Sequence, residues 1–516
     1  ILYKMITKII TYVFLSLVIY FVYIVLIKPL LFRRKFAKYS NVHISPTFIP
    51  LLGDMKSHLD SMNAGKVHYD HLKERAEEIG KYDLKVKLEG VVPYIHIISK
   101  KAVEEFLQLQ PIAIDKQVFD RGVGKFAFDS FMNRSTTSKT KDRRKNFSRW
   151  MNLNSSSAYI PNMLGYAEKH IEEMAKKDKV ELTPYMNILT FLTISGVLFG
   201  KDFESISKKR MEYINSEGKI QQMDLLEMLI TLTKDVVDNY YNPVTSMLPF
   251  LNTYNLVNPF KRCTKNLEVF KTSIGEFLKN SKDLDCVSYK LLKNENCSFR
   301  ENLDDLAAAL IAGTETTSHS LMAFLYYMQK NPEIKQKLIT ELTQNGLVKG
   351  EGFKKNMTLD NIQNLGYLNS CVKEVLRIDS PVIDTFDYQT FENVRICNVP
   401  IQKGIKLKVD IYTAHFDSSK WASPREFIPE RHDVDSDFFK KSKDAGIVSD
   451  VYSRRTFGHG LRSCPGMSLA LLEIKVFMIY FLTHAEVKFE EEDIHNEGIG
   501  FGLGSHFEPK VSVRKL

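Results

Sequence analysis

Hydrophobic residues are distributed unevenly along this chain, and the longest apolar run lies near its start. Residues 9–27 carry no charge, and basic residues border them at Lys8 and Lys28. As an α-helix this run would be about 28 Å long, close to the thickness of a bilayer's hydrocarbon core. A cleavable signal peptide is the alternative, but the run is too long and no small-residue cleavage site follows it. The pattern predicts a membrane anchor over residues 1–28.

The segment after the anchor is first basic and then rich in proline. KPLLFRRKFAK (28–38) carries five Lys and Arg residues, and positive charge of this kind marks the cytosolic side of a membrane span. SPTFIPLLGD (45–54) holds two prolines and a glycine, which indicates a stiff turn. We expect residues 29–55 to be a stop-transfer flank and hinge, and residues 56–516 to be a single cytosolic domain.

Helical periodicity dominates the rest of the chain. The predicted helices cover residues 165–178, 184–199, 203–215, 222–238, 263–280, 301–330, 332–345, 360–378 and 465–484. Strand-like alternation is confined to residues 83–99 and 390–410, with a further hairpin expected in 498–516. The glycines of GIGFGLG (498–504) lack the spacing of a dinucleotide-binding fingerprint. Because strands and helices do not alternate, the fold class is mainly α with small antiparallel β-sheets.

The composition is that of an ordinary globular protein, with 44% hydrophobic and 26% charged residues among 516. The net charge is +9, but the basic residues are scattered among acidic ones, so nucleic acid is not an expected partner. The six cysteines form no C-x-x-C pair and are too few for a disulfide scaffold. Five read as small buried hydrophobes; Cys464 is the exception, because it lies in a loop.

That loop reads FGHGLRSCPG (457–466). A thiolate that binds iron needs a sulfur projected from a loop, with backbone N–H groups directed at it. Three glycines permit such turns, and the N-terminus of the helix after Pro465 favours the thiolate form. Arg462 offers a fixed cation to an anionic group. We take His459 to be solvated or a hydrogen-bond donor rather than a ligand.

The helix over 301–330 is interrupted by AGTETT, whose Gly and Thr residues are poor in helix interiors. Gly313 would let a flat group approach the backbone, and Thr316 would bond back to the carbonyl of Ala312 and bend the helix. The neighbouring acid and alcohol, Glu315 and Thr316, could pass protons through a water. The alternative is a crossing between two helices that requires small residues.

A further pair lies in KEVLR (373–377), where Glu374 and Arg377 share one helix face. Such pairs are usually solvated, but the surrounding sequence is apolar, which favours burial. A buried pair needs additional hydrogen bonds, and Arg431, in a proline-containing loop, is the candidate to supply them.

In this combination and order, the motifs make the chain similar to the cytochromes P450 of the membrane-bound eukaryotic type. The family's cysteine-loop pattern F-x-x-G-x-R-x-C-x-G is met by Phe457, Gly460, Arg462, Cys464 and Gly466. Its oxygen-binding motif is met by Ala312, Gly313, Glu315 and Thr316, and its structural triad by Glu374, Arg377 and Arg431. The resemblance implies that Cys464 is the axial ligand to the iron of haem b (iron protoporphyrin IX). It also implies that Phe457 packs over the sulfur and that Arg462 contacts a haem propionate.

The chain departs from the family pattern at two places. A tryptophan usually precedes an arginine in the helix near KTKDRRKNFSRW, but here the upstream position holds Lys139 or Thr140. A further arginine is usual after E-x-x-R, but residues 378–394 contain none. Either the haem is seated differently, or Arg143 and Lys141 compensate.

The resemblance implies a monooxygenase that inserts one oxygen atom from O2 into a lipophilic molecule. Electrons would come from an NADPH-dependent flavoprotein reductase of the endoplasmic reticulum, with cytochrome b5 as a second donor. The expected docking surface combines Arg454, Arg455 and Arg462 with the basic residues of 139–145. Two alternatives stay open: a haem-thiolate isomerase or dehydratase, and a non-catalytic membrane haem-binding protein.

Overall fold

A computed structural model describes residues 2–54, 56, 76–118, 124, 127–200, 203, 207–241, 250–280, 286–294, 296–490 and 509–516. The α-helices are α1 (Leu2–Val22), α2 (Lys28–Phe36), α5 (Ala76–Ile79), α6 (Lys100–Gln108), α7 (Ser138–Trp150), α8 (Leu153–Ser157), α9 (Ile160–Met174), α10 (Leu182–Phe199), α12 (Leu225–Tyr241), α14 (Phe250–Thr253), α15 (Asn258–Asn280), α16 (Val287–Leu292), α17 (Phe299–Lys330), α18 (Pro332–Gln344), α19 (Phe353–Asn356), α20 (Leu359–Gln363), α21 (Gly366–Ile378), α22 (Tyr412–His415), α23 (Asp437–Asp444) and α24 (Met467–His484). A π-helix, η1 (Tyr23–Ile27), joins α1 to α2, and short 3-10 helices are η3 (Pro429–His432), η4 (Val451–Ser453) and η5 (Gly460–Arg462).

The strands are β1 (Val42–Ile44), β2 (Leu84–Glu89), β3 (Val92–Ile97), β4 (Ile114–Lys116), β5 (Val180–Glu181), β6 (Met211–Ile214), β7 (Ile220–Met223), β8 (Tyr388–Thr390), β9 (Val394–Ile396), β10 (Val399–Ile401), β11 (Lys406–Val409), β12 (Ala485–Phe489) and β13 (Lys510–Lys515). The largest sheet has the order β1-β2-β3-β11-β8-β4. It is mixed rather than purely antiparallel, because β1 pairs with β2, and β3 with β11, in parallel. The mainly α class with small sheets is confirmed, and among the described strands this sheet is the one departure from antiparallel pairing.

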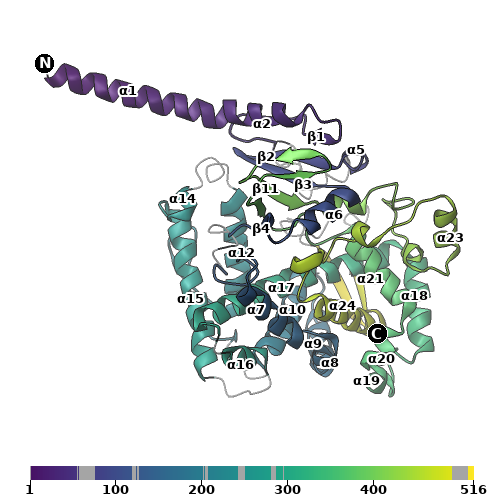
Figure 1. Ribbon diagram of the computed structural model, residues 1–516. Coiled ribbons are helices and arrows are strands. Elements are labelled where there is room, and N and C mark those ends of the chain that lie inside the picture. The colour runs from purple at the N-terminus through teal and green to yellow at the C-terminus, as the bar shows by residue number, and fades with distance from the viewer. Residues whose placement is uncertain are drawn as a thin grey trace.

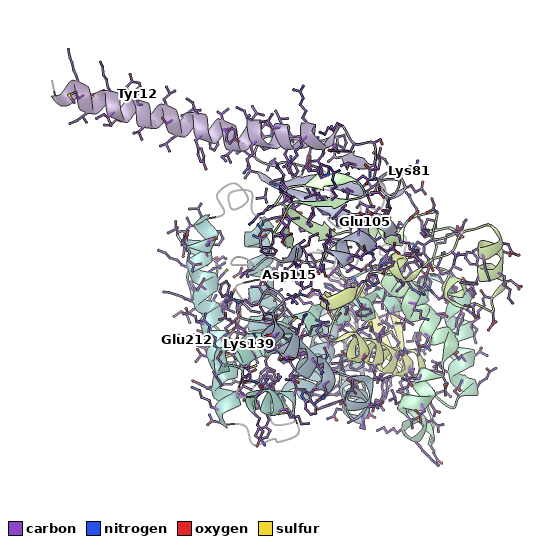
Figure 2. The ribbon with its side chains drawn as sticks, viewed as in Figure 1. Tyr12, Lys81, Glu105, Asp115, Lys139 and Glu212 are labelled. Carbon is purple, nitrogen blue, oxygen red and sulfur yellow. The ribbon has the colours of Figure 1, made fainter. Side chains whose placement is uncertain are left out.

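The N-terminal helix projects from the body, as Figure 1 shows, and Tyr12 lies on its projecting part (Figure 2). The stretch Tyr3–Phe36 is long and apolar enough to cross a membrane. The basic flank is the helix α2, which forms the C-terminal end of this stretch. Its last residue, Phe36, is fully buried against the large sheet. Arg33 donates to Asp54 Oδ1 at 2.8 Å, and Asp54 accepts the backbone N–H of Leu88 at 2.8 Å. The flank is therefore fastened to the sheet by packing and by a half-buried ion pair.

Most of the predicted helices form, but the C-terminal part of the one predicted over 203–215 does not. Residues 211–214 and 220–223 are instead the antiparallel strands β6 and β7. In β6, Met211 and Tyr213 are buried and Glu212 is exposed, which is the alternation of a strand. Asn215 closes the turn by accepting the N–H groups of Glu217 and Lys219. A local polar turn thus overrides the helical pattern.

Two other predictions are refined. The helix predicted over 360–378 is divided into α20 and α21. The C-terminal segment contributes β13, which pairs with β12; the rest of the hairpin predicted over 498–516, residues 498–508, lies outside the described residues. The strands predicted over 83–99 and 390–410 are confirmed as β2–β3 and β9–β11.

The long helix α17 passes through the helical part of the molecule, with α10 and α24 beside it (Figure 1). The helices α10 and α24 are also long and apolar enough to span a membrane by composition, but two-thirds of each is buried in the body. Their apolar sequences therefore reflect core packing. This core fixes α17 and the start of α24 relative to each other, and these two segments carry the candidate site.

Candidate haem-thiolate site

The cysteine loop is a compact turn held by its own backbone. Cys464 N–H donates to the carbonyl of Phe457 at 2.7 Å, and Gly458 N–H donates to that of Arg455 at 2.8 Å. Gly458 and Gly460 have φ values of 65° and 67°, which non-glycine residues rarely adopt. A Cβ at Gly460 would also lie 2.9 Å from Leu107 Cδ2. The glycines are therefore required by the turn, as the sequence predicted.

Cys464 is exposed at the end of this loop. Desolvation by the surrounding protein raises the pKa of its thiol, whereas the N–H of Gly466, the charge of Arg144 and the N–H of Met467 lower it. Backbone donors at the start of α24 thus face the sulfur, which is the donor arrangement a metal-bound thiolate needs. Phe457 is half-buried and packs against the core. His459 stands edge-on to Tyr452 at 5.3 Å, in keeping with a bystander role.

Arg462 turns away from the sulfur and into the protein. Its Nη atoms donate to the carbonyls of Phe131 and Arg134 at 2.9 and 2.6 Å, and to Asp115 Oδ1 at 3.3 Å. Its Nε is buried and has no hydrogen-bond partner. A buried donor without an acceptor is costly, so this atom fits a site for an additional anionic oxygen, such as that of a haem propionate.

The two arginines of α7 have different roles. Arg143 is buried and donates to Asp305 Oδ2 at 3.0 and 2.7 Å and to the carbonyl of Glu301 at 2.8 Å. The expectation that Arg143 compensates for a missing propionate partner is wrong, because α17 already occupies its donors. Arg144 instead reaches the cysteine loop, where it donates to the carbonyl of Ser463. Lys141 is exposed.

The middle of α17 is a continuous helix rather than an interrupted one. Thr316 Oγ1 donates to the carbonyl of Ala312 at 2.6 Å, as predicted, but helical hydrogen bonding persists from Phe299 to Lys330. A Cβ at Gly313 would lie 2.8 Å from Ile194 Cγ1 of α10. The glycine is therefore explained by close packing of the two helices, which was the alternative interpretation. Ala312 is exposed within this otherwise largely buried helix.

The acid of the acid–alcohol pair has an altered proton affinity. Desolvation raises the pKa of Glu315 to about 7, with a smaller opposing effect from a hydrogen bond to Thr233 of α12. Glu315 can therefore both hold and release a proton near neutral pH. Desolvation also lowers the pKa of His319, three residues after Thr316, to about 4. Sequence reasoning did not single out this neutral histidine, because one histidine in an apolar helix carries no distinctive pattern.

The predicted triad is brought together and fully buried. Glu374 accepts Arg377 Nε and Nη2 at 2.9 and 2.8 Å and Arg431 Nε at 2.9 Å. A fourth member was not predicted: His432 Nε2 lies 2.9 Å from Glu374 Oε2. Despite desolvation, Arg377 and His432 hold the pKa of Glu374 well below its usual range. The network joins α21 to η3, and Thr456 Oγ1 extends the connection by donating to the carbonyl of Leu376 at 2.9 Å.

The expected docking surface is smaller than the sequence implied. Arg455 is buried and donates to the carbonyls of Asp410 and Ile98, both at 2.6 Å, so it cannot face a partner. The Arg462 side chain is also buried. Lys141, Lys145 and Arg454 remain exposed.

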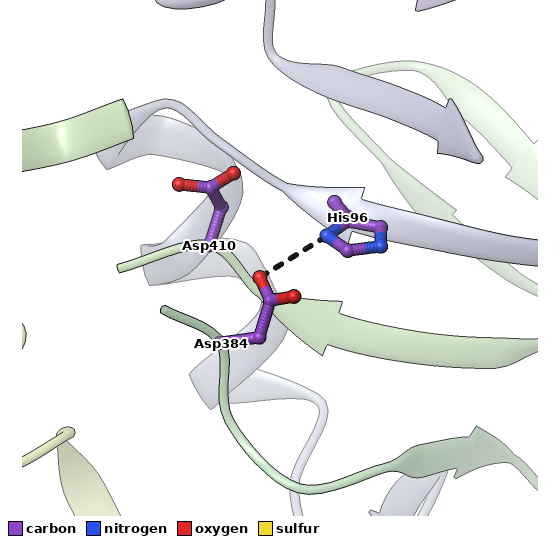
Figure 3. Close-up of side chains that lie close together, drawn as sticks. All are labelled: His96, Asp384 and Asp410. Carbon is purple, nitrogen blue, oxygen red and sulfur yellow. Dashed lines mark ion pairs between the residues drawn. The ribbon is translucent and has the colours of Figure 1, made fainter. Parts of the chain in front are cut away.

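A separate group of possible metal ligands consists of His96, Asp384 and Asp410 (Figure 3). His96 Nδ1 lies 3.3 Å from Asp384 Oδ1. The charges of His96, Lys408 and Lys87 hold the pKa of Asp384 well below its usual range. Burial and the neighbouring charge of Asp384 raise the pKa of Asp410, although Lys85 opposes them. The ion pair of His96 with Asp384 already gives this cluster a structural role.

Comparisons with known proteins indicate the family of this chain. The sequence model of the cytochrome P450 family matches residues 45–509. Cytochrome P450 3A18 of Rattus norvegicus is 25% identical over 61% of this chain and 61% of its own length. Cytochromes P450 3A25 of Mus musculus and 3A5 of Homo sapiens are 23% and 24% identical over 87% and 86% of this chain, and 86% and 85% of their own lengths. These matches support a haem-binding oxidoreductase of the monooxygenase class. The chain belongs to the cytochrome P450 family.

Proposed function

We propose that this chain is a haem-thiolate monooxygenase that inserts one oxygen atom from O2 into a lipophilic small molecule. The observation that carries the proposal is Cys464, presented on a glycine turn with the N–H groups of Gly466 and Met467 directed at its sulfur. When bound, haem b supplies the activation of O2 and the transfer of oxygen to the substrate. The protein binds that group, orients the substrate and controls the protons.

Cys464 would be the axial ligand. Burial raises the pKa of its thiol, and three neighbouring groups oppose that effect. The two backbone donors and Arg144 stabilise negative charge on sulfur. Arg462 would hold a propionate through its unpartnered Nε. The buried network of Glu374, Arg377, Arg431 and His432 would keep the loop in position through α21.

Glu315 and Thr316 would deliver protons during the reaction. The carboxyl of Glu315, with a pKa of about 7, is present in both protonation states near neutral pH. Thr316 Oγ1 is fixed by its bond to the carbonyl of Ala312, so its lone pairs have a defined direction. A water held between the two groups would complete the path to the reacting oxygen.

Electrons would come from NADPH through a flavoprotein reductase, with cytochrome b5 as an additional donor. The exposed cations Lys141, Lys145 and Arg454 would attract an acidic partner. The apolar helix at the N-terminus would anchor the chain in the endoplasmic reticulum membrane, with the domain on the cytosolic side. A lipophilic substrate would reach the site from that membrane.

The test is the spectrum of the reduced protein with carbon monoxide, followed by turnover with NADPH and reductase. We expect the strongly red-shifted Soret band of thiolate ligation and its loss in Cys464→Ala. Cys297→Ala, which removes a half-buried thiol elsewhere, should keep the band. Retention of the band in Cys464→Ala contradicts the ligand assignment. Turnover of a peroxide substrate without NADPH would favour an isomerase or dehydratase, and haem binding with no turnover would favour a haem-binding protein.

A further inference from the structure

Lys116, at the end of β4, is a buried lysine beside the cysteine loop. Its side chain is 6% exposed. Its Nζ lies 3.3 Å from the carbonyl of Phe386 and 4.1 Å from the ring centre of Tyr388, its partner in β8. An ammonium group carries three donors, and among the described residues this carbonyl is the one hydrogen-bond acceptor found for them. No local pattern in the sequence distinguishes this residue.

Lys116 is one of three cations that crowd together here. Arg462 bonds to Asp115, which precedes Lys116, and Arg144 bonds to Ser463, which follows Arg462. The pKa values of two of these cations reflect this proximity. After desolvation, the charge of Arg462 is the largest cause that lowers the pKa of Lys116, to about 7, and it is also the largest such cause for Arg144. The positive charge of Arg462 therefore disfavours the charged forms of Lys116 and Arg144.

The carboxylates near these cations are already engaged. Asp115 accepts the backbone N–H of Lys116 at 2.7 Å and Thr136 Oγ1 at 2.8 Å, besides Arg462. Asp387 accepts Tyr94 Oη at 2.8 Å and lies 3.4 Å from Lys406 Nζ. Figure 2 shows Asp115 where the large sheet meets the helical part of the molecule. Among the described residues, Asp115 is the one carboxylate that forms an ion pair with any of the three cations, and the buried Nε of Arg462 still needs an acceptor.

We propose that Lys116, Arg144 and Arg462 together bind the two carboxylates of the haem, with Lys116 replacing the arginine missing after E-x-x-R. This inference rests on the proposed haem-thiolate function and names the residues that seat its cofactor. The two carboxylates supply acceptors for Arg462 Nε and for Lys116 Nζ. An adjacent anion also favours the charged form of the lysine. Arg462 lies in the cysteine loop, and Arg144 is hydrogen-bonded to that loop. Lys116 directly follows Asp115, which is hydrogen-bonded to Arg462.

The test compares how quickly the holoprotein loses haem and haem dimethyl ester, in which both carboxylates are blocked, to excess apomyoglobin. We expect Lys116→Ala to speed loss of haem by about tenfold or more, as for removal of a charged hydrogen bond, and to leave loss of the ester nearly unchanged. Lys116→Arg should stay close to the wild type. Lys408→Gln, which removes another buried lysine of the same sheet, should affect both cofactors equally.

Equal acceleration for haem and its ester in Lys116→Ala would overturn the proposal, because it would show a structural role alone. Lys116→Gln, which preserves more of the side chain, serves if the alanine variant does not fold. Equal loss of the two cofactors from the wild-type protein would also overturn the proposal. Failure of the proposed function would look different: the wild-type protein would lack the thiolate carbon monoxide band.

Discussion

Gly313 of α17 lies against Ile194 of α10 so closely that a Cβ at position 313 would be 2.8 Å from Ile194 Cγ1. We expect Gly313→Ala to destabilise the protein by about 1–3 kcal/mol, because the added methyl group must displace Ile194 or separate the helices. Thermal unfolding of the holoprotein measures this effect. The double variant Gly313→Ala, Ile194→Val should recover part of the loss.

The matched control is Gly165→Ala in α9. Gly165 is exposed, and no atom lies within 4 Å of a Cβ built there. Alanine is a better helix former than glycine, so this variant should be more stable by about 0.5–1 kcal/mol. If both variants changed stability in the same direction and by the same amount, the contact with Ile194 would not be the reason for the glycine.

The second prediction concerns the pH dependence of proton delivery. Because the pKa of Glu315 is raised to about 7, its carboxyl is mostly protonated below that pH and mostly ionised above it. The fraction of NADPH electrons recovered in product should therefore fall as pH rises from about 6 to about 8. In Glu315→Gln this dependence should disappear. A wild-type profile that is flat over this range, or one that Glu315→Gln leaves unchanged, contradicts the role.

The same group contributes to stability in the same direction. The folded protein binds the Glu315 proton more tightly than the unfolded chain does, so this contribution is present at low pH and is lost as pH rises from about 4.5 to about 7.

Thr316→Ala removes the other member of the pair without this titration. We expect it to lower product formed per NADPH by at least about tenfold and to release peroxide instead. Unchanged coupling in Thr316→Ala would exclude proton delivery by this hydroxyl.

The third prediction concerns Glu374. Arg377→Ala would leave a buried carboxylate without its main partner, and we expect a loss of about 3–5 kcal/mol and a poor yield of holoprotein. Since the pKa of Glu374 is held well below its usual range, its stabilising effect is present above the unfolded pKa and is lost as pH falls. The control is Lys337→Ala, which removes the partner of Glu430 at 2.7 Å on the exposed side of η3. It should cost less than about 1 kcal/mol, and equal losses in both would show that burial of Glu374 does not matter.

The site residues that could be predicted from the sequence are those whose role depends on their spacing from residues nearby in the chain. Glu374 and Arg377 are three residues apart on one helix, and Gly458 and Gly460 of the cysteine loop have the positive φ values that such a turn requires. The contributions of His432, Arg144 and Lys116 depend on which segments meet in space, so no local pattern predicts them. Arg143 and Arg144 illustrate the limit: they are adjacent in sequence, but one faces α17 and the other the cysteine loop.

For the fold as well, elements with a clear local pattern were predicted, and elements that depend on particular side-chain contacts were not. Helical period and length predicted α10, α17, α18 and α24 to within a few residues, because these helices are long and apolar. The hairpin of β6 and β7 escaped prediction because its strands are four residues each and its turn depends on the side chain of Asn215. Likewise, the sequence around Gly313 is compatible with two interpretations, because the contact with Ile194 joins segments that are far apart in the chain.

The fourth prediction tests the docking surface. Lys141→Glu, Lys145→Glu and Arg454→Glu should each lower the rate of electron transfer from the reductase at low salt, by about threefold or more. High salt should reduce the difference, because exposed charges are screened. Lys355→Glu, an exposed substitution in α19, is the control and should have no effect. A salt-independent loss would point to misfolding instead of weaker docking.

The last prediction concerns the junction between the anchor and the domain. If α2 is part of the folded domain, a protein that begins at Lys28 should be as stable as the full chain, whereas one that begins at Lys38 should not be. The longer truncation removes Phe36, which is fully buried, and the ion pair of Arg33 with Asp54. Burial of one aromatic side chain contributes about 1.5–3 kcal/mol, and Phe36→Ala in the full chain should reproduce most of that loss. Equal thermal stability of the two truncated proteins would show that α2 is a passive flank, and that the orientation of the anchor relative to the sheet is not fixed by this packing.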